Sequence, residues 1–115
     1  MKKYKWHKIA NSVEELGFKS NGLLETEVEG KRICLAKTEK GLFACAAKCP
    51  HASGELAEGE IDGAGNIVCP IHRYKFDPEN GRNVSGEGYY LKTYPLEVRE
   101  DGIYIGLQDG GIFGW

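Results

Sequence analysis

The sequence contains no long hydrophobic run. Its longest uninterrupted apolar stretch covers residues 42–47, far fewer than the ~20 apolar residues that a membrane-spanning helix needs. The basic N-terminus is not followed by an apolar segment, so we predict no secretory signal and expect a cytoplasmic protein. The formal net charge of −2 supplies no excess of positive charge for the phosphates of a nucleic acid. These absences disfavour membrane, exported and nucleic-acid-binding proteins.

Linkers, low-complexity tracts and the pattern of a long helix are also missing. The 115 residues suit one domain, which we predict to span residues 1–115. Apolar residues make up 41% of the chain and charged residues 28%, a balance typical of globular rather than disordered proteins. The 16 glycines exceed average usage and indicate many turns, and therefore short strands.

Short apolar segments separated by turn residues predict an all-β fold. We expect roughly seven to ten short antiparallel strands in a sandwich or small barrel. A capping box at Ser12 predicts one short helical turn. A loop-rich insertion is expected over about residues 46–76, in which only residues 67–68 have the pattern of a strand. The strands expected outside this insertion cover residues 4–9, 23–28, 32–37, 42–47, 90–99 and 103–107.

Cysteine and histidine are few, but most of them fall into two similar segments. These are Cys49-Pro50-His51 and Cys69-Pro70-Ile71-His72, which are separated by 17 residues. Without an export signal the expected compartment is reducing, where clustered cysteines and histidines more often bind metal than form disulfides. The proline after each cysteine fixes its own φ and keeps the cysteine extended, which stiffens both turns. Each segment therefore offers one thiolate and one imidazole to a shared inorganic centre.

Two kinds of centre suit these four residues. A single zinc ion is one, because a set of two cysteines and two histidines is common in structural zinc sites. Such sites usually take two close cysteines from one turn and two histidines from a helix, whereas here the order is mixed and neither histidine lies in a helical pattern. The mixed order suits a two-iron cluster better, because opposed turns can give both thiolates to one iron and both imidazoles to the other.

The two segments resemble the ligand boxes of the Rieske [2Fe–2S] family. Gly54, Leu56 and Phe76-Asp77 resemble the usual context of these boxes. The resemblance implies one [2Fe–2S] cluster per chain in a Rieske-like antiparallel sandwich or small barrel with a loop-rich cluster-binding subdomain. It further implies that Cys49 and Cys69 bind the inner iron, and that His51 and His72 bind the outer iron near the surface.

The same resemblance predicts an electron carrier rather than an enzyme. Four protein ligands leave the irons no open position for a substrate, and the sequence shows no other catalytic motif. The pattern is similar to soluble Rieske ferredoxins, which implies a reductase and a terminal oxygenase, or a similar acceptor, as partners. The alternative is a small subunit of a larger oxidoreductase, similar to the nitrite reductase small subunits that share the fold.

Several residues depart from the family pattern. High-potential Rieske proteins carry a disulfide between positions that match Gly54 and Ile71, and hydroxyl donors at positions that match Tyr74 and Phe76. Here the disulfide is absent, Phe76 has no donor, and Tyr74 is too bulky to be equated with the serine of those proteins. We therefore predict a low midpoint potential of about −150 to 0 mV. Arg73 stands where the family usually has glycine. Residues 84–91 lack the proline of the loop that covers the cluster in relatives, so the shielding of the cluster is left open.

The remaining cysteines and charges have simpler interpretations. Cys34 and Cys45 are expected to be buried in adjacent strands as small apolar residues. His7 is expected at the surface or the edge of the core. Basic residues near the two boxes contrast with an acidic stretch at residues 55–62, and the charges form either a solvated surface of mixed sign or a docking face for a partner. The basic residues concerned are Lys48, Arg73 and Lys75.

Overall fold

Three antiparallel sheets organise the part of the chain that the computed structural model describes, namely residues 3–50, 54–71, 73–86 and 88–108. These ranges contain ten strands, the four-residue helix α1 (Val13–Leu16) and the 3₁₀ turn η1 (Leu56–Glu58). The predicted all-β class is therefore confirmed. Ser12 caps α1 by accepting a hydrogen bond from the backbone N–H of Glu15 at 3.2 Å, as the capping box predicts. No helix in the described ranges has the length and apolar character needed to cross a bilayer.

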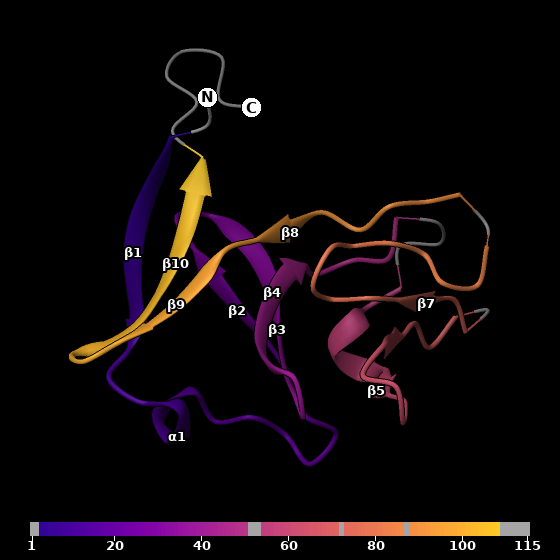
Figure 1. Ribbon diagram of the computed structural model, residues 1–115, viewed down its shortest axis with the longest axis horizontal. Coiled ribbons are helices and arrows are strands. Elements are labelled where there is room, and N and C mark those ends of the chain that lie inside the picture. The colour runs from indigo at the N-terminus through magenta and orange to yellow at the C-terminus, as the bar shows by residue number, and fades with distance from the viewer. Residues whose placement is uncertain (1–2, 51–53, 72, 87, 109–115) are drawn as a thin grey trace.

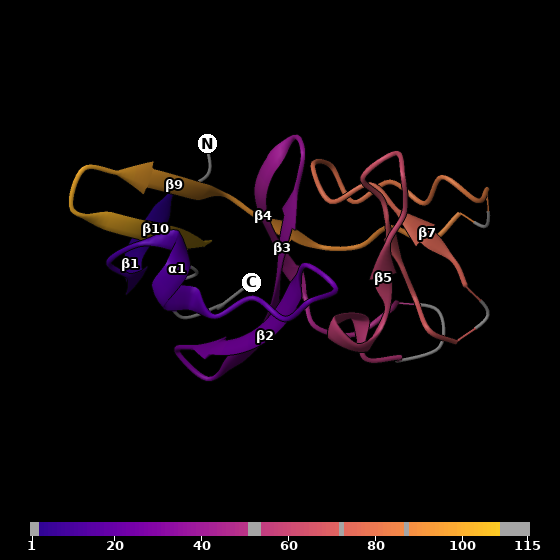
Figure 2. The ribbon, with the colours of Figure 1, turned by 90° about the horizontal axis from the view of Figure 1, so that it is seen from below.

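The first sheet brings distant parts of the chain together. It contains β1 (Tyr4–Ala10), β10 (Gly102–Gln108) and β9 (Leu96–Arg99), in the order β1-β10-β9. His7 of β1 lies opposite Ile105 of β10, and its imidazole is 19% exposed at the edge of the sheet, as expected. In Figures 1 and 2 this sheet lies at one end of the molecule.

The second sheet forms the centre of the molecule. It contains β2 (Leu23–Val28), β3 (Lys31–Thr38), β4 (Gly41–Ala46) and β8 (Thr93–Tyr94), in that order. Glu29 and Gly30 join β2 to β3 with φ values of 51° and 80°, the left-handed conformations that a two-residue type I′ hairpin turn requires. The strands predicted over residues 23–28, 32–37 and 42–47 are therefore confirmed to within a residue.

Residues 90–99 do not form the single strand that was predicted. Residues 90–92 lie outside any named strand, and Pro95 separates β8 from β9. The reason is that the chain changes sheets here, because β8 pairs with β4 whereas β9 pairs with β10. Pro95 has no N–H to donate to a ladder, so it suits the point of exchange.

The third sheet includes the strand that directly precedes Cys69. It contains β5 (Glu60–Ile61), β6 (Ile67–Val68) and β7 (Lys75–Phe76), in that order, and follows η1 in the chain. The prediction recognised β6 and was wrong in leaving out β5 and β7. Both are only two residues long, so no alternation of apolar and polar residues can develop in them. In Figure 1, β5 and β7 lie on the opposite side of the central sheet from β1 and β10, an arrangement that Figure 2 shows from below.

Strand β3 separates two hydrophobic cores. Ile33 and Leu35 pack into a core shared with the first sheet, which includes Ile105. Cys34 and Ala36 belong to the other core, which extends to the third sheet. All four of these β3 residues are fully buried. Because successive side chains on a strand point to opposite faces, β3 forms a wall between the two cores.

Candidate metal centre

Two of the four predicted ligands, Cys49 and Cys69, lie side by side beneath the third sheet. Cys49 follows β4 and Cys69 follows β6, and the two are 2% and 0% exposed. Burial raises the pKa of the Cys69 thiol, the backbone N–H of Ile71 opposes this effect, and the adjacent Cys49 side chain raises the pKa further. Two neighbouring buried thiols are therefore difficult to ionise unless a cation compensates their charge.

The predicted histidine ligands, His51 and His72, lie outside the described residues. Accordingly, the described residues contain no group of three or more histidine, cysteine or carboxylate side chains that could hold a metal ion. The structure brings together the two cysteines, and in the sequence a histidine follows each of them within three residues.

Those two turns are closed in the same way. The backbone N–H of Cys49 donates to the carbonyl of Gly54 at 2.9 Å, and that of Cys69 donates to the carbonyl of Tyr74 at 2.8 Å. Each hydrogen bond joins a cysteine to the residue five positions later, and each closed turn includes one histidine of the sequence. We call them the first ligand turn (residues 49–54) and the second ligand turn (residues 69–74). Further pairing between Lys48 and Glu55 extends the closure of the first turn.

Gly54 allows the two ligand turns to approach each other. A Cβ atom at this position would lie 2.8 Å from the Sγ of Cys69 and 3.3 Å from the Cδ1 of Ile71. Glycine is therefore required by close contact between the turns rather than by its backbone conformation. Gly54 and Ile71 match the disulfide positions of high-potential relatives, and here a glycine and an aliphatic side chain occupy them in direct proximity. All four cysteines are free.

Arg73 has a left-handed backbone conformation, with φ of 57°. This explains why glycine is usual at the position, since a side chain is disfavoured there by about 1–2 kcal/mol. The Arg73 Nη2 lies 3.1 Å from the Oε1 of Glu60, and the Lys75 Nζ lies 3.6 Å from the Oδ2 of Asp62. The two basic residues near the second ligand turn are thus paired with acidic residues near β5.

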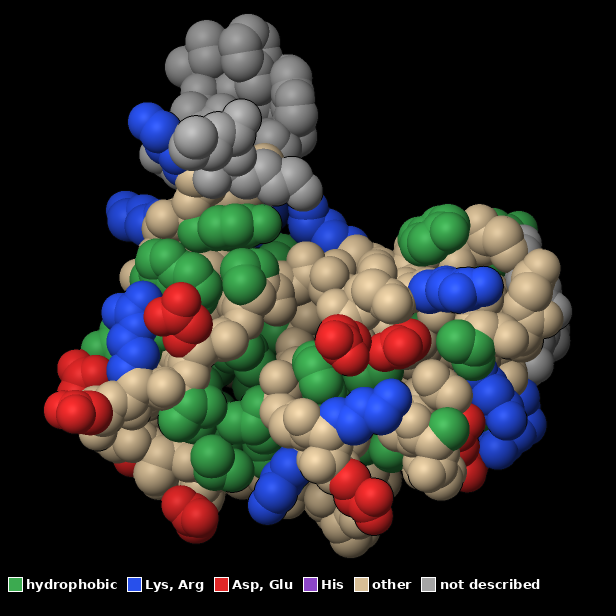
Figure 3. Space-filling model, in the orientation of Figure 1, with side chains coloured by type: hydrophobic (Ala, Val, Ile, Leu, Met, Phe, Trp, Pro, Cys, Tyr) green, Lys and Arg blue, Asp and Glu red, His purple; other side chains and the backbone are tan. Residues whose placement is uncertain are grey.

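Acidic and basic side chains are also intermixed elsewhere on the surface, as Figure 3 shows for one face. Arg32 of β3 contacts the carboxylates of both Glu25 and Glu55, so it ties the first ligand turn to the central sheet. The hydrogen bond from Arg32 is the main reason that the pKa of Glu25 is lowered. This arrangement agrees with the predicted surface of mixed sign.

A second pair of cysteines serves as a comparison for the first. Cys34 and Cys45 are opposite residues of β3 and β4 and are 0% and 1% exposed, which confirms their prediction as core residues. The neighbouring Cys34 side chain and burial hold the pKa of the Cys45 thiol well above its usual value. Both residues lie within strands, and neither is followed directly by a proline as Cys49 and Cys69 are. Proximity of two buried thiols alone therefore does not define the candidate centre.

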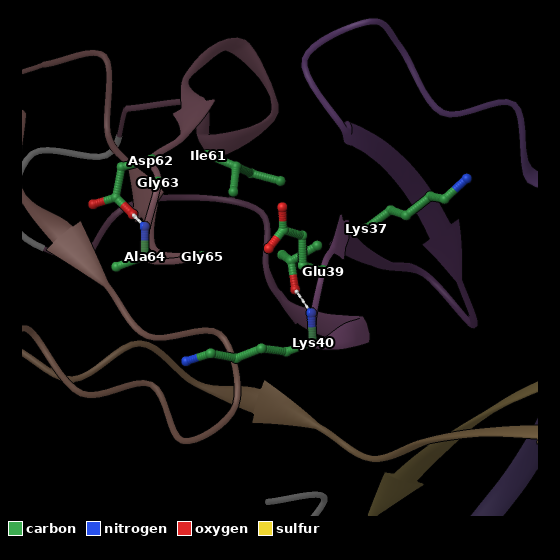
Figure 4. A pocket seen from close by; sticks show the side chains of 9 residues that line it. Lys37, Glu39, Lys40, Ile61, Asp62, Gly63, Ala64 and Gly65 are labelled. Carbon is green, nitrogen blue, oxygen red and sulfur yellow. Dashed lines mark hydrogen bonds between the residues drawn. The ribbon is translucent and has the colours of Figure 1, made fainter.

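An open cavity lies apart from the two cysteines. It has a volume of about 600 Å³ and lies between the β3–β4 turn and the β5–β6 turn. Figure 4 shows that its polar groups support these turns: the Oδ1 of Asp62 accepts from the N–H of Ala64 at 2.9 Å, and the Oγ1 of Thr38 accepts from the N–H of Lys40 at 3.0 Å. Among its described lining residues there is neither Cys49 nor Cys69.

Sequence reasoning singled out residues 84–91 but missed how the third loop, of which they are part, packs on the second ligand turn. It runs from Arg82 to Leu91 and includes buried Asn83 and half-exposed Tyr89. Oδ1 of Asn83 accepts two hydrogen bonds from Ser85, whereas its Nδ2 is a buried nitrogen without a partner among the described residues. The turn-forming sequence between Asn83 and Tyr89 gives no signal that would identify these contacts.

The fold and the paired ligand turns define a class of protein. The model of the Rieske [2Fe-2S] domain family matches residues 5–95, and the chain belongs to this family. The predicted resemblance is therefore confirmed.

The chain is similar to a ferredoxin component in sequence and to a chain of an oxygenase–ferredoxin complex in fold. The ferredoxin component of the naphthalene 1,2-dioxygenase system of Pseudomonas aeruginosa is 30% identical over 87 residues, which cover 75% of this chain and 83% of the relative. Among solved structures, a chain from the complex of reduced oxygenase and oxidized ferredoxin in carbazole 1,9a-dioxygenase has a TM-score of 0.71 at 22% identity, covering 87% of this chain and 91% of the other.

A nitrite reductase small subunit also shares the fold. The putative NADH-dependent small subunit from Mycobacterium tuberculosis has a TM-score of 0.75 at 16% identity, covering 90% of this chain and 96% of the other. At such low identities, both structural likenesses show a common fold. The similarity in sequence to a ferredoxin component is the more informative comparison about function.

Proposed function

We propose that this protein is a one-electron carrier that receives electrons from a reductase and passes them to an oxygenase-type acceptor. The observation that carries the proposal is the pair of buried cysteines at the bases of two identically closed turns, in a chain of the Rieske [2Fe-2S] domain family. Relatives that are ferredoxin components of oxygenase systems support this choice of partners.

The proposed site consists of Cys49, His51, Cys69 and His72, which hold one [2Fe–2S] cluster per chain. The two adjacent thiols fit such a cluster, because a metal would favour the thiolates that burial alone disfavours. Gly54 leaves the sulfur of Cys69 unobstructed. When bound, the cluster supplies a centre that takes up and releases one electron without an open position for substrate.

The chain's own residues then have distinct tasks. The hydrogen bonds that close the two ligand turns hold the cysteines in place, and the packed core of the third sheet excludes water from the thiol side. Histidine ligands lack the negative charge of thiolates, which raises the potential relative to clusters with four cysteines. Phe76 is fully buried and has no donor to raise it further, which supports a potential at the low end of the Rieske range.

Electron paramagnetic resonance of the dithionite-reduced protein, together with iron and acid-labile sulfide analysis, tests the proposal. We expect a Rieske-type signal, two irons per chain, and loss of both in Cys69→Ala. Cys45→Ala is the matched control, because Cys45 is equally buried and has a cysteine neighbour but lies in a strand. Protein that contains zinc instead, or no metal when isolated anaerobically, would contradict the assignment.

The alternative, a permanent small subunit of a larger oxidoreductase, has weaker support. The nitrite reductase small subunit shares the fold at 16% identity, whereas the ferredoxin component shares 30% of its sequence. A large partner that co-purifies stoichiometrically would favour this alternative over a carrier that exchanges partners.

A further inference from the structure

The third loop, residues 82–91, is hydrogen-bonded to Lys75 of β7, the residue that directly follows the second ligand turn. The N–H of Val84 donates to the carbonyl of Lys75 at 2.9 Å, and the N–H of Lys75 donates to the Oγ of Ser85, also at 2.9 Å. The base of the loop is closed by the N–H of Leu91, which donates to the carbonyl of Gly81 at 2.8 Å. Both ends of the loop are therefore fixed relative to β7.

Buried Asn83 fixes the side chain of Ser85. The Ser85 hydroxyl donates to the Oδ1 of Asn83 at 2.8 Å, and the Ser85 N–H donates to the same oxygen at 2.9 Å. The hydroxyl oxygen is thereby oriented to accept from Lys75. We call this chain of hydrogen bonds the Ser85 link, and it connects the loop to the residue that directly follows the second ligand turn.

The loop places Tyr89 against Tyr74. The two rings are stacked, with centroids 6.3 Å apart and planes inclined by 29°. Tyr74 packs against the core that contains Cys49 and Cys69, and its carbonyl accepts the hydrogen bond that closes the second ligand turn. Tyr89 is thus the next layer outward from the cysteines. Its neighbour Tyr90 is 70% exposed, compared with 42% for Tyr89.

We propose that Tyr89, held by the Ser85 link, is a positioning residue that shields the second ligand turn from water. This inference rests on the proposed function, because it assigns a role toward the cluster. Reduction adds a negative charge to the cluster, and water stabilises that charge better than the protein interior does. Tyr89 therefore slows loss of the cluster and lowers its midpoint potential, in a chain whose corresponding loop has no proline.

Tyr89→Ala and Tyr90→Ala form a matched pair for the test, because the same side chain is removed from adjacent positions. The readouts are the rate at which the visible absorption bleaches in the presence of an iron chelator and the midpoint potential from an anaerobic redox titration. Because Tyr89→Ala loses one aromatic pair, we expect its absorption to bleach about two- to tenfold faster than that of the wild type. Its midpoint potential should be higher than that of the wild type. Tyr90→Ala should match the wild type, since the stacked pair of Tyr89 and Tyr74 stays intact.

Ser85→Ala provides an independent variant that leaves every aromatic ring in place. It should shift both readouts in the same direction as Tyr89→Ala, because the loop loses the hydrogen bond from the N–H of Lys75 and keeps only the one from Val84 to the carbonyl of Lys75. Far-ultraviolet circular dichroism establishes that each variant is folded. Equal bleaching rates and equal midpoint potentials for Tyr89→Ala and Tyr90→Ala would overturn the inference. If Tyr89→Ala does not fold, a Ser85→Ala protein with the bleaching rate and midpoint potential of the wild type would overturn it.

Failure of this inference differs from failure of the proposed function. If wild-type protein contains no iron and sulfide, the function itself is wrong. If wild-type protein carries the cluster and the two tyrosine variants behave alike, the cluster assignment stands and only the role of Tyr89 is refuted.

Discussion

The left-handed conformation of Arg73 leads to a prediction about stability. At φ of 57°, a residue with a side chain is disfavoured by about 1–2 kcal/mol. Arg73→Gly removes this strain, while the added freedom of glycine in the unfolded chain costs about 0.4–1 kcal/mol. The backbone contribution alone should therefore make glycine more stable than alanine at this position by about 0.5–1 kcal/mol.

The ion pair with Glu60 has to be separated from this effect. The side chains of Arg73 and Glu60 are 62% and 55% exposed, and their Nη2 and Oε1 atoms are 3.1 Å apart. Such an exposed ion pair contributes about 0–1 kcal/mol to the free energy of unfolding. Arg73→Ala loses the pair and keeps the strain, whereas Arg73→Gly loses both. The comparison between these two variants cancels the ion pair and isolates the backbone. We expect Arg73→Gly to lie near the wild type and Arg73→Ala below it.

Thermal unfolding of the anaerobic, metal-loaded variants, followed by circular dichroism at one scan rate, measures the difference. The expected gap is about 2–6 °C in favour of Arg73→Gly. Glu100 is the control, because it is an exposed turn residue without a positive φ, and there alanine should be more stable than glycine. An Arg73→Ala protein as stable as Arg73→Gly would refute the strain argument.

Three further predictions concern the ligand turns and their surroundings. Gly54→Ala should lower the iron and sulfide content of the purified protein, because its Cβ would approach the cysteine sulfur to 2.8 Å, whereas Gly63→Ala meets no atom within 4 Å and should leave the content unchanged. The pKa of Glu25 is lowered in the folded protein, so its stabilising contribution is present above its unfolded pKa of about 4.3 and is lost as the pH falls through the folded value. Glu25→Gln should therefore have a lower thermal midpoint than the wild type at pH 7, and this difference should disappear in strong acid. A difference in thermal midpoint that persists in acid would contradict the assignment to the ionised Glu25 carboxylate. Finally, Glu60→Gln combined with Asp62→Asn leaves their two basic partners unpaired and should make electron delivery to an acceptor oxygenase more dependent on ionic strength, measured by stopped-flow; an unchanged salt dependence would exclude these residues from docking.

Local sequence signals were sufficient to predict most of the fold. The hairpin at Glu29-Gly30 and the helix cap at Ser12 follow from residues that are adjacent in the chain, so the pattern contains the needed information. Residues 90–99 were predicted wrongly because the exchange of sheets at Pro95 depends on the positions of β4 and β10. Strands of two residues escaped detection for lack of length.

The candidate site was predicted in its residue types and spacing, and less well in its surroundings. Cys49 and Cys69 stand out because both are followed by proline and histidine within a short distance. The requirement for glycine at position 54 follows only from the three-dimensional structure, because a Cβ there would meet the sulfur of Cys69 in the second ligand turn. The stacking of Tyr89 on Tyr74 joins residues 15 positions apart through a loop, and no periodic pattern records it.

The two-sided burial of β3 has a consequence for its alignment. Small side chains, Cys34 and Ala36, face the core that contains Cys49 and Cys69, whereas the larger Ile33 and Leu35 face the other core. A shift of the β3 pairing register by one residue would exchange these two sets of side chains. One core would then be overfilled and the other would contain voids. A single insertion or deletion in this strand should therefore lower the stability of the fold far more than one in either neighbouring turn. The register of β3 thus determines the packing of both cores.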